Sequence, residues 1–88
     1  MNKNRRKELR DWVKMAEDWV VNGEEIKSTL ENICSDEEDY FNNIPENLQS
    51  SQRASDAEEV IDALNEAIDA LSSAIDSVEE AISCVEDI

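Results

Sequence analysis

Several residue types are absent or scarce in this chain, among them histidine, the most frequent general acid-base catalyst. Among its 88 residues there is no histidine, one glycine and one proline, and aromatic residues make up 5%. The sequence contains no nucleophile elbow and no glycine-rich phosphate loop. Nothing in it predicts a concave fold that would exclude water from a reaction. We therefore expect no catalytic residues, no cofactor and no enzymatic activity.

Long hydrophobic runs are also missing. No stretch reaches the length of a membrane-spanning helix or of a signal-peptide core. The two cysteines, Cys34 and Cys84, are too few for a disulfide framework. We interpret them as small, semi-buried residues, with a cross-link between chains as the alternative. We expect a reducing, cytoplasmic setting and no contact with a membrane.

Negative charge, by contrast, is abundant. The chain carries 23 acidic and 8 basic residues, for a net charge of −15, and six of the bases lie within residues 1–14. The remaining body repels nucleic acid and anionic membranes. We therefore expect no direct nucleic-acid binding, and either a protein partner with a basic surface or a second copy of the chain. We expect no metal site, because residues 36–39 lack the ligand spacing and turn glycine of a calcium loop.

The second half of the chain repeats one seven-residue phrase: DALNEAI, DALSSAI and DSVEEAI follow one another from Asp62 to Ile82. With Ile61 at heptad position a, every a and d position from there on is apolar, which predicts a coiled-coil helix over about 51–88. Its start lies at Ser51 or at Ser55. The a row is Ile61, Ile68, Ile75 and Ile82, and the d row is Leu64, Leu71, Val78 and Val85.

The first half keeps a single heptad register from Leu9 to Ile44. This register predicts a helix over about 4–44, either unbroken or kinked at residues 22–23, where Asn22-Gly23 also reads as a helix end. We favour a single helix that is kinked or locally frayed there over two separate helices, because a true break seldom preserves the register. The a row is Leu9, Ala16, Gly23, Leu30, Glu37 and Ile44, and the d row is Trp12, Trp19, Ile26, Ile33 and Tyr40.

A loop over 45–50 begins at Pro45, which disfavours continued helix. Residues 9–44 and 53–88 are equally long, and two such helices joined by a short loop predict an all-α, antiparallel helical hairpin, a coiled coil that forms one domain over 1–88. The expected register places Trp19 against Ile75. It also lays the basic first turns beside the acids at the end of the second helix, which are Glu79, Glu80, Glu86 and Asp87.

Two apolar features flank this expected seam. Trp12 and Trp19, at position d, are expected to pack against the second helix, with partner anchoring as the alternative. A further stripe is expected to stay uncovered and to dimerise the hairpin into a four-helix bundle, or else to dock on a protein target. It consists of Val13, Val20, Cys34 and Phe41 on the first helix and Val60, Ala67, Ala74 and Ala81 on the second.

The segment DEEDYFNNIPENLQSS, from Asp36 to Ser51, is preceded by Asn4-Arg5-Arg6-Lys7 and followed by the DALxxAI heptads. In these features the chain resembles a set of small acidic proteins of unassigned function from Gram-positive bacteria and their phages. Those proteins carry Pro-Glu-(Asn/Ser)-Leu-Gln between two charged helices, and here that stretch is Pro45 to Gln49. The resemblance implies a phage or mobile-element origin and no mechanism.

The acidic helix faces suggest a function. A homodimer could match the linear charge density of duplex DNA, so we expect a DNA-mimic-like inhibitor or decoy that occupies a nucleic-acid-binding surface of a host or defence protein. The alternative is a structural coiled-coil oligomerisation module whose acids serve only solubility. The acids expected to bind are Asp62, Asp69, Asp76, Glu59, Glu66 and Glu80 on the second helix and Glu17, Glu24, Glu31 and Glu38 on the first.

Overall fold

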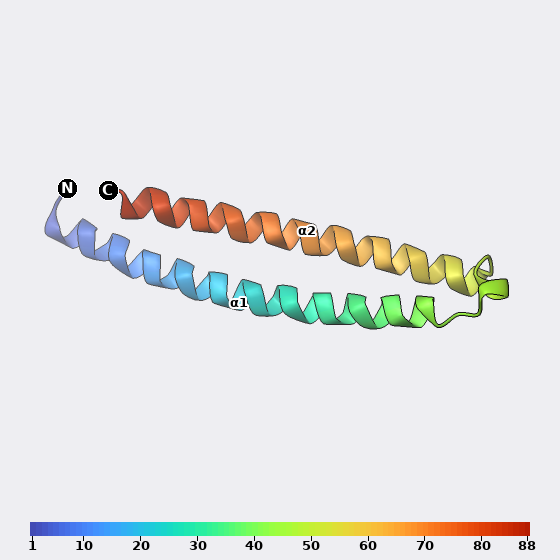
Figure 1. The fold of residues 1–88 in the computed structure, drawn as a ribbon. Helices are drawn as coiled ribbons and strands as arrows, with labels where there is room; N and C mark the ends of the chain where they lie inside the picture. The colour runs from blue at the N-terminus through green and yellow to red at the C-terminus, as the bar shows by residue number, and fades with distance from the viewer.

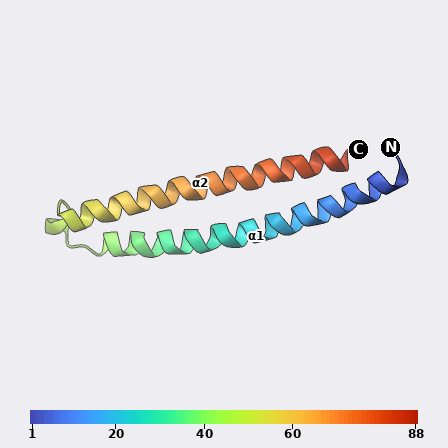
Figure 2. The ribbon, with the colours of Figure 1, turned by 180° about the vertical axis from the view of Figure 1, so that it is seen from behind.

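The computed structural model describes all 88 residues and confirms the helical hairpin (Figure 1). Helix α1 runs over Lys3–Asn42, a single 3-10 turn η1 over Glu46–Leu48, and helix α2 over Gln52–Glu86. The two helices lie side by side and antiparallel, so both termini are at one end and η1 is at the other (Figures 1 and 2). The molecule is a rod of 69 × 15 × 14 Å.

Helix α1 is capped by Asn2, whose side-chain oxygen accepts a hydrogen bond from the Arg5 N–H at 2.7 Å. It passes through Asn22-Gly23 without a break, and no residue of the chain has a positive φ. The helix ends at Asn42, two residues before the expected end. The N–H of Ile44 bonds the Phe41 carbonyl instead of continuing the helical ladder toward Pro45.

The connection is short and is held by its own residues. Pro45 has φ −53° and leads into η1. The Gln49 side-chain amide then donates to the Ile44 carbonyl at 2.8 Å, which satisfies a backbone acceptor in the connection. Ile44 itself is buried. The Pro45 to Gln49 stretch therefore reverses the chain in a defined way.

Helix α2 begins directly after its N-cap, Ser51, which is the earlier of the two expected starts. The Ser51 hydroxyl accepts a hydrogen bond from the Ala54 N–H at 3.3 Å. The a and d rows of α2 face α1: Ile75 and Ile82 are buried, and Leu64, Leu71, Val78 and Val85 are half-buried. The seam on this helix is the one that the repeat predicts.

The seam on α1 is different from the expected one. It uses the a row together with the e row, whereas the d row lies outside. Trp12, Trp19, Ile26, Ile33 and Tyr40 are between 37% and 59% exposed. The prediction that the two tryptophans pack in the seam is therefore wrong. The buried or half-buried apolar residues and glycine of α1 are Leu9, Val13, Ala16, Val20, Gly23, Leu30, Cys34 and Phe41.

Small residues in the a row explain this choice. A Cβ atom added at Gly23 would lie 3.2 Å from the Cγ1 atom of Ile75, so the helices approach closely there. Ala16, the preceding a residue, is also buried. Indole rings in the d row would hold the helices apart, whereas Val13 and Val20 in the e row fit beside small residues. Close approach therefore places the tryptophans outside the seam.

The helix register is correspondingly displaced by one turn. Gly23, rather than Trp19, lies against Ile75. Farther along, the Cys34 Sγ atom lies 3.7 Å from the Asn65 Oδ1 atom. Because Gly23 stands four residues after Trp19, α1 meets α2 about one helical turn later than expected.

Candidate protein-binding surfaces

One side of the hairpin is lined by carboxylates, and we call it the acidic side. Glu17, Glu24, Glu31 and Glu38 follow one another every seven residues along α1, which places them about 10.5 Å apart in one exposed row. Glu38 shares a shallow hollow with Glu58 and Asp62 of α2, and Glu17 shares another with Glu79 and Glu86. Both helices therefore contribute acids to this side.

The expected acidic residues of α2 divide between two directions. All six are exposed. Asp62, Asp69 and Asp76 form a second heptad row on the acidic side, in line with the Glu38 and Asp62 hollow. Glu59, Glu66 and Glu80 occupy position f, which points away from α1 on the back of the rod. The structure thus groups seven of the ten expected acids on one side, whereas their binding role stays a prediction.

Few of these acids are neutralised within the chain. The one salt bridge joins the Lys7 Nζ atom to an Asp11 carboxylate oxygen at 3.2 Å, and both side chains are exposed. All other carboxylates lack a basic group within 4 Å. The negative potential of the acidic side is therefore screened only by the solvent and its ions.

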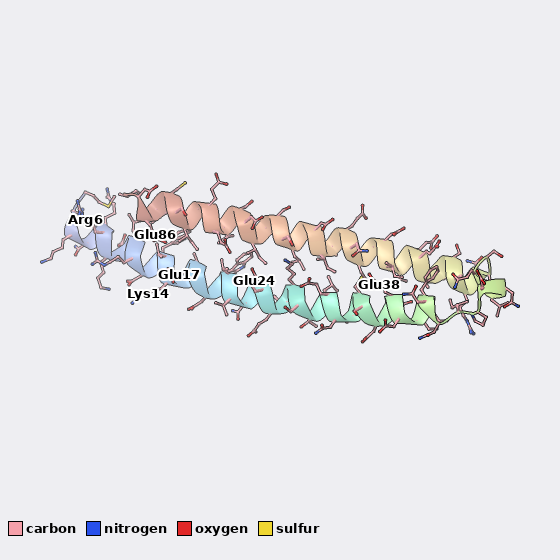
Figure 3. All side chains as sticks on the ribbon, viewed as in Figure 1. Arg6, Lys14, Glu17, Glu24, Glu38 and Glu86 are labelled. Carbon is pink, nitrogen blue, oxygen red and sulfur yellow. The ribbon has the colours of Figure 1, made fainter.

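The basic N-terminal turns lie beside the end of α2, as the charge distribution predicts. Arg6, Arg10 and Lys14 line one hollow together with Glu17 and Glu86. Figure 3 shows Arg6, Lys14 and Glu86 at the open end of the hairpin, with Glu24 and Glu38 farther along α1. This end is mixed in charge, whereas the rest of the acidic side carries one base, Lys27, among its acids.

The expected dimerisation stripe needs correction on α1. Val13, Val20 and Phe41 are half-buried and Cys34 is buried, because these residues form the seam with α2. They are not an uncovered surface. On α2, Val60, Ala67 and Ala74 are exposed and Ala81 is half-buried, so that row stays largely outside the seam.

A different apolar surface is exposed, opposite the acidic side. The α1 d row borders the α2 g row here: Tyr40 and Val60 line one hollow, which near the loop also includes the charged Glu37, Arg53 and Asp56. The heptad positions around these two rows carry no charge over most of the rod. We call this surface the uncharged face. Its members are Trp12, Met15, Trp19, Asn22, Ile26, Thr29, Ile33 and Tyr40 of α1 and Val60, Ala63, Ala67, Ala70, Ala74, Ser77, Ala81 and Cys84 of α2.

The sequence held a signal for this face. The d row of α1 is apolar throughout and the e row is apolar except for Lys27, so either could have formed the seam. The two small a residues, Ala16 and Gly23, favour a close helix pair and therefore the row with smaller side chains. The d row, with its larger side chains, is then left outside the seam and becomes part of the uncharged face.

Cys34 is the one titratable group whose environment stands out. Its buried thiol donates toward the Glu38 carboxylate, with 3.6 Å between Sγ and Oε1. Burial, this hydrogen bond and the carboxylate charge all raise the pKa of the Cys34 thiol. Cys84, in contrast, is exposed. The neutral form of Cys34 is thus favoured, as suits a packing residue.

Neither a metal site nor a membrane span is found. No three His, Cys, Asp or Glu side chains are grouped so that they could hold a metal ion. Neither helix is long and apolar enough to cross a membrane.

Comparison with known proteins yields no relative: no family model, no curated protein and no solved structure matches this chain. Any functional conclusion therefore has to come from the two surfaces described above.

Proposed function

We propose that this chain is a non-enzymatic acidic protein that binds a protein partner and occupies that partner's nucleic-acid-binding surface, as a phage-type inhibitor or decoy of a host or defence protein would. The acidic side supports this proposal. Its carboxylates form exposed rows along both helices, and no ion pair within the chain neutralises them. A basic surface that accepts a row of phosphates would also accept such a row.

The linear charge density of the hairpin is of the same order as that of duplex DNA. From Glu17 to Asp87, and leaving out Glu46, the hairpin carries 20 acids. These acids span about 50 Å of the 69 Å rod, which is one charge per ~2.5 Å, against one per ~1.7 Å of duplex DNA. Two copies side by side, with one charge per ~1.3 Å, would exceed the duplex.

A structural oligomerisation module is the second candidate. The uncharged face favours it, because a coiled coil whose acids only provide solubility needs just such an apolar surface for pairing. The two candidates differ in what the acidic side does. It binds in the first and is only hydrated in the second.

Capture from a bacterial lysate on the immobilised chain separates these candidates. The decoy function predicts proteins that a short DNA duplex displaces and that rising salt releases steeply. Changing Asp62, Asp69 and Asp76 together to Asn should remove most of this capture, because these residues lie exposed on the acidic side. Helicity should be unchanged.

A matched triple variant controls for net charge. Asp18, Asp36 and Asp39 changed to Asn remove the same charge from α1 positions off the acidic side. This variant should retain far more of the captured protein than the Asp62, Asp69 and Asp76 variant. Equal losses in both would show that only the total charge matters. The decoy function would be ruled out if neither the DNA duplex nor added salt released the captured proteins.

A further inference from the structure

The uncharged face is unusual for a chain of this composition. More than a third of the residues are charged. Nevertheless, the heptad rows around Trp12, Ile26 and Val60 carry no charge over most of the rod, and charged exceptions such as Asp36, Arg53 and Asp56 lie near the loop. A solvent-facing side of a coiled coil would instead carry charged residues. We infer that this face is covered in solution by the same face of a second copy, which gives a two-fold symmetric four-helix bundle.

The hairpin alone buries very little. Only eight residues are buried, and no large side chain is completely enclosed. Eleven large apolar residues are exposed, and eight of them lie on or at the end of the uncharged face: Trp12, Met15, Trp19, Ile26, Ile33, Tyr40, Val60 and Ile88. The molecule therefore has a larger apolar surface to cover than it has core.

The area of the face suits a stable dimer. From Trp12 to Tyr40 the d row extends about 42 Å at ~1.5 Å per residue. With the 15 Å width of the rod, the face covers roughly 600 Å² per copy, at the upper limit for a monomer's surface patch. Two such faces together bury roughly 1,200 Å², where stable interfaces begin.

Charge indicates how the two copies are placed. The open end, residues 1–14 and 79–88, carries six basic and six acidic residues. The loop end, residues 36–62, carries nine acidic residues and one basic residue. Two loop ends placed together would repel each other, so the open end of one copy lies over the loop end of the other. A two-fold axis across the middle of the rod produces this arrangement.

The α1 d row is compatible with that axis. Its residues are seven apart throughout, and Ile26 is the central one. An antiparallel pairing of two α1 helices about Ile26 sets Trp19 beside the partner's Ile33 and Trp12 beside the partner's Tyr40. The alanine-rich row of α2 then lies against the same row of the second copy, and its small side chains allow these two helices to approach closely. The acidic sides of both copies remain free, so this pairing is independent of the proposed decoy function.

Mass measurement with two matched variants tests the pairing. Light scattering of the wild type should give about twice the 10.0 kDa chain mass. Ile26 and Val21 are aliphatic residues of α1 with similar exposure, 59% and 61%, but Val21 occupies position f, on the back of α1 and away from the uncharged face. Ile26→Glu should weaken the dimer at least tenfold, and Val21→Glu should leave it unchanged. A wild type that stays monomeric, or equal effects of both variants, would overturn the inference.

Oxidative cross-linking tests the placement of the copies. In a Cys84→Ser background, Ile26→Cys should form a disulfide-linked dimer, because the two copies of residue 26 meet at the axis. Val21→Cys should not cross-link at a comparable rate. Buried Cys34 stays present in both proteins. Slow and equal cross-linking of the two variants would contradict the pairing of α1 with α1.

Discussion

Gly23 controls how closely the two helices approach. A side chain there would meet Ile75, since even a Cβ would lie 3.2 Å from its Cγ1 atom. We predict that Gly23→Leu destabilises the hairpin by about 1–3 kcal/mol, even though leucine favours helix more than glycine does. Ser28→Leu, at an exposed position of the same helix, serves as control and should change the stability little. Urea unfolding followed by circular dichroism measures both, and equal effects would refute the close approach.

The two cysteines should differ strongly in reactivity. Cys84 is exposed, whereas Cys34 is buried with a raised thiol pKa. Near pH 8 we predict that a maleimide modifies Cys84 at least tenfold faster than Cys34, because the reagent needs an accessible thiolate. Mass spectrometry after proteolysis gives the two rates, and comparable rates in the folded protein would contradict the buried position of Cys34.

The raised pKa of the Cys34 thiol also makes the stability of the folded protein depend on pH. Because the folded state holds the Cys34 proton more tightly than the unfolded chain does, the folded state loses stability as the pH rises above the ordinary value of 9.0. The stability that Cys34 contributes is fully present below pH 9.0 and is lost as the pH rises through the raised pKa of the folded state. Cys34→Ala should remove this part of the alkaline decline, and the melting temperature measured against pH reports it.

Two serines in the sequence could have capped the N-terminus of helix α2. Ser51 caps the helix, although Ser55 with Glu58 resembles a capping box. We predict that Ser51→Ala lowers the free energy of unfolding by about 1 kcal/mol. Ser55→Ala should be nearly neutral, because Ser55 lies inside α2. Thermal melts of the two variants measure the difference, and the reverse order would move the helix start to Ser55.

The helices could be predicted from the sequence because their signals are local. Heptad spacing fixes α2, and Pro45 fixes the end of α1 to within a few residues. The pairing of the helices could not be fixed in the same way. It depends on a competition between two apolar rows of α1, decided by the contact of Gly23 with Ile75 across the hairpin. Ile75 is far from Gly23 in the sequence, so local patterns do not indicate this contact. The predicted register is therefore wrong by one helical turn.

For the whole molecule, the unbalanced charge has a direct consequence. A net charge of −15 with one internal salt bridge means that carboxylates repel one another in the folded state. Added salt should therefore stabilise this protein. Between about 10 mM and 1 M NaCl, where the screening length falls from ~30 to ~3 Å, we predict a clear rise in the melting temperature. An unchanged or lower melting temperature would mean that the repulsion is already balanced.

The two sides of the rod are expected to act independently, with the acids binding and the uncharged face pairing copies. Capture of DNA-displaceable proteins from one lysate by three immobilised chains tests this most directly: the wild type, Ile26→Glu, and the triple change of Asp62, Asp69 and Asp76 to Asn. We predict that the wild type and Ile26→Glu retain these proteins, whereas the triple variant releases them at low salt. This prediction would be contradicted if the triple variant kept the same proteins at high salt while Ile26→Glu lost them, because the uncharged face would then be the surface that binds the target.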